Sequence, residues 1–328
     1  MLAKRGIMSK RCFERSEDLH MSDEDFMRRA IELAERGRYS VMPNPLVRCV
    51  LVRNGEIIAE GWHDHLGGLH AEQMAIHDAE ENGHNTNGST AYVTLEPCNH
   101  FGRTPPCTEA LLWAGISEVK VAHSDPNPLV RGNGIAVLEK AGIKVDSGLL
   151  EDEAAEQMRE FLHWCKTRKP FVTVKIATDA NGSVDDLSGE SGRFTSEECL
   201  AQVHQLRKDC CAILVGANTV IRDNPSLTVR LVETNRQPLR IVIDPNNRIQ
   251  KEAVLLNDGF GTRHLNEGFG GLEGRLDMLG DLELQRLLVE GGPATINNFL
   301  EADLVDEFIL VKSDIVHKET VLGDFNLT

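Results

Sequence analysis

The sequence predicts an α/β protein made of two successive domains, each with a sheet between helices. Short apolar runs alternate with helical patterns along the chain, which is the order typical of α/β sheets. The length of 328 residues also favours two hydrophobic cores over one. We therefore expect a three-layer α/β/α domain over residues 22–166 and a second α/β domain over 167–328, preceded by a disordered leader over 1–21.

Turns, caps and periodicity predict the elements of the first domain. Ser22, with Asp25 three residues later, fits the start of a helix that ends near Gly37. Asn54-Gly55 separates two strand-like runs, 47–52 and 57–61, and predicts a hairpin. The later elements alternate: a helix from residue 70, strand 90–95, helix 108–114, strand 118–122, helix 134–141, strand 144–147 and an acidic helix over 151–166.

The second domain begins where Lys169-Pro170 leads into a β-rich run. Apolar runs predict strands at 171–176, 212–215, 240–243, 287–289 and 308–311, with a helix at 294–300. The glycine-rich stretch 259–274 is predicted to be a surface loop. Because few residues follow the last predicted strand, we expect an apparently truncated sheet with an unpaired edge.

Composition excludes several classes of protein. With 51 acidic against 35 basic residues, the net charge of −16 and the lack of a basic stripe disfavour a nucleic acid partner. No apolar run has the length of a membrane span. Eight dispersed cysteines indicate reduced thiols or metal ligands, as in the cytoplasm. The leader contains basic residues, but its acidic residues do not fit a transit peptide, so we expect a disordered leader or a start at Met21.

Four residues of the first domain predict a zinc site. His70, Cys98 and Cys107 supply one imidazole and two thiolates, which leaves the fourth position open for water, as in catalytic zinc sites. Zinc lowers the pKa of its water toward about 7, and Glu72 would move the protons of a hydrolytic deamination. His-Ala-Glu and Pro-Cys match the zinc deaminase pattern, except for the insert 99–106 between the cysteines. The alternatives are a closed structural site completed by His100, or a non-catalytic zinc module that scaffolds an oligomer.

Longer motifs extend through both domains. The first half contains Pro43-Asn44-Pro45, the run from Leu95 to Cys107, and Asp125-Pro126-Asn127-Pro128. The second half contains Leu227-Thr228-Val229-Arg230 and Glu290-Gly291-Gly292-Pro293. Over residues 22–312 the chain resembles the bifunctional riboflavin-biosynthesis deaminase–reductases. The resemblance implies deamination of a diaminopyrimidinone carrying ribose 5-phosphate, followed by NADPH reduction of the ribose in a dihydrofolate-reductase-like domain, and it implies a homo-oligomer.

The resemblance also assigns site residues. Arg103, inside the cysteine insert, is in a position to meet a substrate phosphate, whereas Asp125 and Asn127 have simple turn chemistry as an alternative. The residues expected to bind substrate are Asn44, Arg103, Asp125 and Asn127 in the first domain, and Ser191, Arg207, Leu227, Arg230 and Glu290 in the second. The residues expected to bind NADPH are Ala177, Arg193, Thr219, Asp223, Gly292, Pro293 and Ala294.

The sequence departs from the family pattern at several positions. Arg48 stands where the family has glycine, which puts a long charged side chain at the start of a buried strand beside the pocket. Asn181 lies in an altered turn, Arg193 replaces a tryptophan and Pro245 replaces a cofactor-loop residue. The departures in the second domain leave open a deaminase whose second domain no longer reduces anything. Nucleic acid editing would need a basic face and stacking aromatics, and aromatics are only 5% of the chain.

Overall fold

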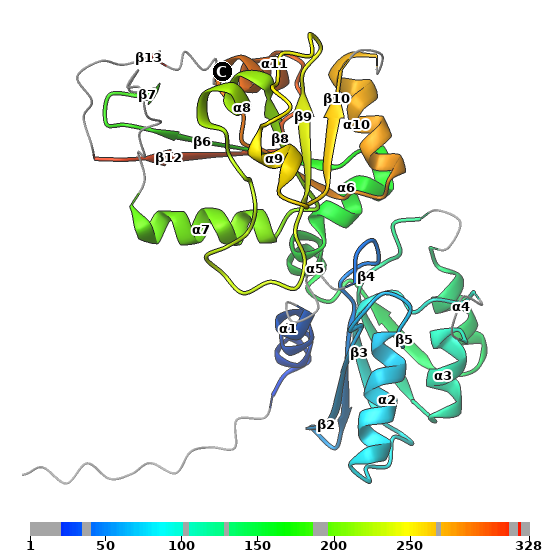
Figure 1. The fold of residues 1–328 in the computed structure, drawn as a ribbon. Coiled ribbons are helices and arrows are strands. Elements are labelled where there is room, and N and C mark those ends of the chain that lie inside the picture. Colours follow the sequence, from blue (N-terminus) through cyan, green and yellow to red (C-terminus); the bar gives the residue numbers. More distant parts are fainter. Residues whose placement is uncertain are drawn as a thin grey trace, which may run out of the picture.

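The computed structural model describes residues 21–34, 41–100, 105–127, 131–185, 196–266, 270–314 and 321–322. It has two α/β domains, seen below and above in Figure 1, with α5 (Glu151–Gln157) and α6 (Arg159–Thr167) between them. The predicted leader, apart from Met21, lies outside the described residues. So do three of the expected site residues: Arg103, Ser191 and Arg193.

The first domain contains a five-stranded sheet in the order β2-β1-β3-β4-β5. The predicted hairpin joins β1 to β2, and Asn54 and Gly55 both have positive φ (54° and 79°), as a tight hairpin turn requires. β1 also pairs antiparallel with β3, whereas β3, β4 and β5 are parallel. The strands are β1 (Arg48–Arg53), β2 (Glu56–Trp62), β3 (Thr90–Leu95), β4 (Glu118–His123) and β5 (Lys144–Ser147).

Helices cover both faces of this sheet, so the three-layer prediction is confirmed. The alternation along β1 shows why: Cys49 and Leu51 belong to one apolar core, whereas Val50 and Val52 belong to the core on the opposite face. The helices of the first face are α2 (Ala71–Glu81), α3 (Cys107–Trp113) and α4 (Asn133–Lys140), and α1 (Asp23–Ala34) and α5 cover the second. Ser22 begins α1 as predicted, and its Oγ accepts a hydrogen bond from the Asp25 N–H at 3.2 Å.

The second domain contains a six-stranded parallel sheet in the order β10-β9-β8-β11-β6-β12. Its strands are β6 (Phe171–Thr178), β8 (Ala212–Gly216), β9 (Leu239–Ile243), β10 (Thr262–Leu265), β11 (Arg286–Val289) and β12 (Glu307–Lys312). A separate pair is formed by β7 (Ser183–Asp185) and β13 (Val321–Leu322). The helices are α7 (Glu197–Lys208), α8 (Ala217–Asp223), α9 (Val254–Asn257), α10 (Gly271–Asp281) and α11 (Pro293–Glu301).

Two predictions about individual elements are wrong. The expected surface loop 259–274 contains strand β10 and the start of helix α10. Of the four residues of β10 only Leu265 is buried, so this edge strand has no apolar run to reveal it. The expected single helix over 151–166 is two helices, because the backbone leaves helical geometry at Met158 (φ −103°, ψ 14°).

Helix α6 fastens the first domain to the second. The Trp164 indole Nε1 donates a hydrogen bond to the Gly280 carbonyl of α10 at 2.9 Å, and the Arg168 guanidinium lies 3.9 Å from the Trp164 ring centroid. Arg159 and Glu160 form ion pairs with β12 and β11, to Glu307 at 2.8 Å and to Arg286 at 3.1 Å respectively. Helix α6 is therefore packed against the second domain, whereas α5 packs on the first.

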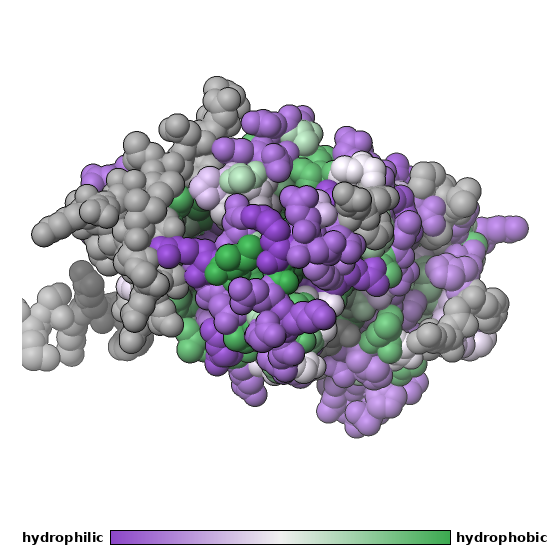
Figure 2. Space-filling view, turned by 45° about the horizontal axis from the view of Figure 1, so that its top comes forward, coloured by the Kyte–Doolittle hydropathy of each residue, from purple (hydrophilic) through white to green (hydrophobic). Residues whose placement is uncertain are grey.

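On the face shown in Figure 2, hydrophilic side chains predominate among the described residues, and hydrophobic ones form small groups among them. Among the described residues, no helix combines the length and the hydrophobicity that crossing a bilayer would need.

The contact at Gly280 should make this position intolerant of any side chain. A Cβ at Gly280 would lie 1.7 Å from the Arg168 carbonyl oxygen, so Gly280→Ala should force α10 away from the linker and cost about 1–3 kcal/mol of stability. Thermal unfolding followed by circular dichroism measures the loss. Gly261→Ala is the control, because a Cβ there meets only Leu239 at an ordinary 3.6 Å; equal stability of the two variants would contradict the prediction.

Candidate functional site

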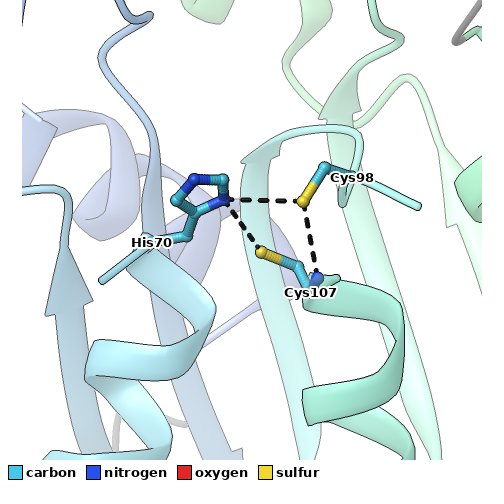
Figure 3. Close-up of side chains that lie close together, drawn as sticks. All are labelled: His70, Cys98 and Cys107. Atoms are coloured by element: carbon cyan, nitrogen blue, oxygen red, sulfur yellow. Dashed lines mark hydrogen bonds between the residues drawn. The ribbon is translucent and has the colours of Figure 1, made fainter. Parts of the chain in front are cut away.

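Three predicted metal ligands come together at one end of the first sheet. His70 precedes α2, Cys98 follows β3, and Cys107 is the first residue of α3. The His70 Nδ1 lies 3.2 Å from the Cys107 Sγ and 3.5 Å from the Cys98 Sγ (Figure 3). The three ligand atoms all lie within 4.8 Å of one another, which a single metal ion could bridge.

The chemistry of this donor set fits zinc. The hydrogen bond from Cys107, together with that from His70, lowers the pKa of the Cys98 thiol to about 4, which favours the thiolate that zinc binds. His100 is exposed and is not in the cluster of potential ligands found among the described residues. The described part of the chain therefore offers three protein ligands and leaves the fourth position for water, which argues against the closed structural site.

Glu72 lies beside this cluster in the first turn of α2. Its side chain is 2% exposed and makes a hydrogen bond with Cys107. Burial, and to a smaller extent the nearby Cys98 thiolate, raises the pKa of the Glu72 carboxyl to about 7. A buried carboxyl that gains and loses its proton near neutral pH is suited to proton transfer.

His63, which the sequence reasoning missed, connects Asn44 to the metal ligands. The Asn44 Nδ2 donates to the His63 Nε2 at 3.0 Å, and the His63 Nδ1 donates to the Leu69 carbonyl at 2.9 Å. The His63 ring also stands edge-on to the His70 ring, with centroids 5.5 Å apart. Burial lowers the pKa of His63, so the neutral ring can accept from Asn44. Its position directly after β2, before the Gly67-Gly68 break, was the only available sequence signal.

Arg48 does not project into solvent at the mouth of the pocket. Its side chain is fully buried at the start of β1, with its guanidinium carbon 5.5 Å from the ring centroid of Trp62, its neighbour on β2. The Arg48 backbone N–H donates to the Thr94 Oγ1 at 3.1 Å. The cationic side chain is thus part of the sheet packing, and its charge also contributes to the lowered pKa of His63, after burial and the neighbouring histidines.

Asp125 and Asn127 lie on a loop that a buried carboxylate holds in place. Glu96, directly before Pro97, accepts backbone N–H bonds from Asp125 at 3.2 Å, from Gly132 at 3.0 Å and from Gly134 at 3.1 Å. The loop therefore lies against the segment that carries Cys98. The Asp125 Oδ1 accepts from the Asn127 N–H at 2.8 Å, so the turn chemistry considered for these residues is present.

In the second domain, four of the expected substrate residues lie around the end of β11. Arg207 donates to both carboxylate oxygens of Glu290, at 2.6 Å and 2.9 Å, and both side chains are largely buried. Arg207 is thus not a solvated surface arginine. Leu227 has a positive φ of 53°, and Arg230 folds back onto its own loop by donating to the Thr228 Oγ1 at 2.7 Å.

Four of the residues expected to bind NADPH lie together around the start of α11, the helix that follows strand β11. Gly292 immediately precedes this helix, Pro293 is its first residue and Ala294 its second. The Gly292 N–H donates to the Thr219 Oγ1 of α8 at 3.1 Å, and a Cβ at Gly291 would lie 2.7 Å from the Thr295 Cβ. Gly291 therefore permits close packing at a helix N-terminus, a common site for a phosphate. Ala177 lies near the end of β6 and Asp223 ends α8.

Both domains match known families. Residues 20–123 match the cytidine and deoxycytidylate deaminase zinc-binding region, and residues 170–316 match the RibD C-terminal domain. The riboflavin biosynthesis protein RibD of Aquifex aeolicus is 39% identical over 93% of this chain and 91% of its own. The chain belongs to the RibD family. RibD of Escherichia coli is likewise 39% identical over 88% of this chain and 87% of its own.

Solved structures agree with this assignment. RibD of Acinetobacter baumannii, at 36% identity, aligns over 93% of this chain and 90% of its own with a TM-score of 0.84. The diaminohydroxyphosphoribosylaminopyrimidine deaminase/5-amino-6-(5-phosphoribosylamino)uracil reductase of Thermotoga maritima, at 35% identity, aligns over 93% and 91% with a TM-score of 0.85. The chain is therefore a bifunctional deaminase and reductase of riboflavin biosynthesis, with a zinc-binding deaminase domain and an NADPH-dependent reductase domain.

Removing one thiolate should empty the metal site. Cys107→Ala leaves only two of the three converging ligands, so the zinc content of the purified protein should fall to a small fraction of the wild-type value. Metal analysis by atomic absorption gives the stoichiometry. Cys210→Ala removes another fully buried thiol, in the second domain, and should leave the zinc content unchanged. Full zinc retention by Cys107→Ala would show that Cys107 is not a ligand.

Proposed function

We propose that the two domains act in succession on one phosphorylated pyrimidine. The first would hydrolyse an amino group of 2,5-diamino-6-(5-phosphoribosylamino)pyrimidin-4-one, and the second would reduce the ribosyl group of the product to ribityl. The observation that supports this most directly is the convergence of His70, Cys98 and Cys107 beside the buried Glu72. The substrate class agrees with the activity for which the Thermotoga maritima relative is named.

In the deaminase domain, His70, Cys98 and Cys107 would hold the zinc ion. When bound there, zinc lowers the pKa of a water molecule toward about 7 and so provides hydroxide at neutral pH. Glu72 would take the proton of that water and pass it to the departing nitrogen, so that water and the amine become a carbonyl and ammonia. Burial of Glu72 keeps bulk water away from this proton transfer.

Other residues of the deaminase domain would position the substrate. Asn44, which hydrogen-bonds to His63 next to His70, would contact the pyrimidine ring. Asp125 and Asn127 would contact the substrate from the loop that Glu96 holds. We assign Arg103, in the insert between the cysteines, to the ribose phosphate, because a guanidinium can bind a phosphate through two hydrogen bonds.

In the reductase domain, NADPH would lie across the carboxyl ends of the strands. Gly292, Pro293 and Ala294 would meet a cofactor phosphate at the start of α11, and Ala177, Arg193, Thr219 and Asp223 would complete the site. Ser191, Leu227, Arg230 and the Arg207–Glu290 pair would hold the substrate. Although burial raises it, the pKa of Glu290 is lowered overall by the Arg207 guanidinium, so Glu290 remains an acceptor for sugar hydroxyls.

A single preparation tests the two-step proposal. Purified protein given the diaminopyrimidine phosphate should release ammonia, and addition of NADPH should then yield the ribitylamino product, identified by mass spectrometry. Release of ammonia without consumption of NADPH would show that the protein is a deaminase whose reductase domain is inactive.

Glu72→Gln should abolish deamination without removing zinc. The amide cannot carry the proton, so ammonia release should fall by about 10²–10⁴-fold. NADPH consumption with the already deaminated substrate should stay at the wild-type rate, which provides the internal control. A variant that still deaminates at the wild-type rate would assign the proton transfer to another group.

Thr219→Val should weaken NADPH binding selectively. The Thr219 hydroxyl accepts from the Gly292 N–H and so fixes the start of α11, and losing about 1 kcal/mol should raise the KM for NADPH roughly fivefold. Thr262→Val, on β10, removes a hydrogen bond to the Leu255 carbonyl of α9 and serves as the control. If the two variants had the same KM for NADPH, the cofactor would not bind at the start of α11.

A further inference from the structure

The segment 41–46, which carries Asn44, lies where the two domains meet. A small cavity separates it from the second domain and is lined by residues of both domains. Met42 and Asn44 line it from the deaminase side, and Gln285 lines it from the reductase side. Because of this cavity, the segment is incompletely packed on that side, and the direct contacts across the domain boundary contribute to fixing its position.

Gln285 makes the most specific of these contacts. It lies directly before β11, its side chain is buried, and its Nε2 donates a hydrogen bond to the Pro43 carbonyl. The backbone of Gln285 is itself held in the sheet, because its carbonyl accepts from the Phe171 N–H at 2.8 Å. Beside it, the Cys211 Sγ lies 3.2 Å from the Met42 Sδ. Two residues of the reductase domain, Gln285 and Cys211, thus contact two consecutive residues of the segment, Pro43 and Met42.

The contacts continue from this segment to the metal ligands. Asn44 follows Pro43 directly, and its backbone N–H closes a turn onto the Val41 carbonyl at 2.9 Å. Its side chain donates to His63, whose ring stands against His70. The chain of contacts from Gln285 to the first metal ligand therefore passes through only Pro43, Asn44 and His63.

We propose that Gln285 of the reductase domain is a positioning residue for the deaminase site. By fixing the Pro43 carbonyl, it sets the position of Asn44 and, through it, the orientation of His63. The deaminase pocket would then reach its full efficiency only when the reductase domain is docked. This inference rests on the proposed role of Asn44 in substrate binding.

The two activities of one chain separate this role from a merely structural one. Loss of ordinary packing between the domains would lower the stability of the whole protein and so both activities. A positioning role predicts an effect on deamination alone, although the altered side chain belongs to the reductase domain. Displacement of a substrate-holding group by a fraction of an ångström is enough to reduce kcat/KM strongly.

The test is Gln285→Met in the full-length chain, which keeps the side-chain volume and removes the donor. The deaminase kcat/KM should fall roughly tenfold or more, with the reductase kcat and KM and the zinc content within about twofold of wild type. Gln157→Met is the matched control: its amide donates to the Ile31 carbonyl at 2.6 Å, between α5 and α1, away from the pocket. This control should leave the deaminase kinetics unchanged.

Unchanged deaminase kinetics in Gln285→Met would overturn the proposal, and so would the same loss in Gln157→Met. Should Gln285→Met lose both activities, Gln285→Asn takes its place, because its shorter amide stays polar but cannot reach Pro43. A selective loss of deamination in Gln285→Asn supports the proposal, and wild-type deamination or a second joint loss overturns it. Wild-type protein without deaminase activity would instead refute the proposed function itself.

Discussion

The close approach of helix α2 to strand β2 is the constraint on which the deaminase site depends. A Cβ at Gly61 would lie 2.1 Å from the Ala71 carbonyl oxygen and 2.2 Å from the Ala75 nitrogen, so only glycine permits this contact. Ala71 and Ala75 are fully buried on the helix side of the same contact. This packing sets the position of the first turn of α2, where His70 and Glu72 meet Cys98 and Cys107 from two other elements.

Buried charge is the second organising feature, and each buried carboxylate has a defined set of partners. Glu96 accepts several backbone N–H groups and joins the Asp125 loop to the Cys98 segment. Glu290 is neutralised by the two hydrogen bonds from Arg207. Glu72 differs, because burial outweighs its charge partners and raises the pKa of its carboxyl. The group with the raised pKa is the one assigned to proton transfer, whereas Glu96, with its several backbone donors, fixes a loop.

Much of the fold followed from local patterns. Apolar runs and caps predicted the strands of the first domain and most of the second, because buried parallel strands and amphipathic helices leave clear periodicities. The sequence did not predict strand β10, because the polar side chains of this edge strand are exposed. It did not predict the break at Met158, because no glycine or proline marks that position. The position of His63 in the site was not predicted either, because it depends on contacts with Asn44 and His70, which lie on other segments.

The sequence by itself determined the identity of the chemical groups. One imidazole, two thiolates and a nearby carboxylate specify zinc and proton transfer wherever the chain folds them together, and the motifs around them determine the family. Only the tertiary structure decided the neighbours of these groups: the burial of Glu72 and Arg48, the pairing of Arg207 with Glu290, and the contact of Gln285 with Pro43. Such contacts join residues far apart in the chain, and no local pattern records them, because packing brings them together only after the domains have formed.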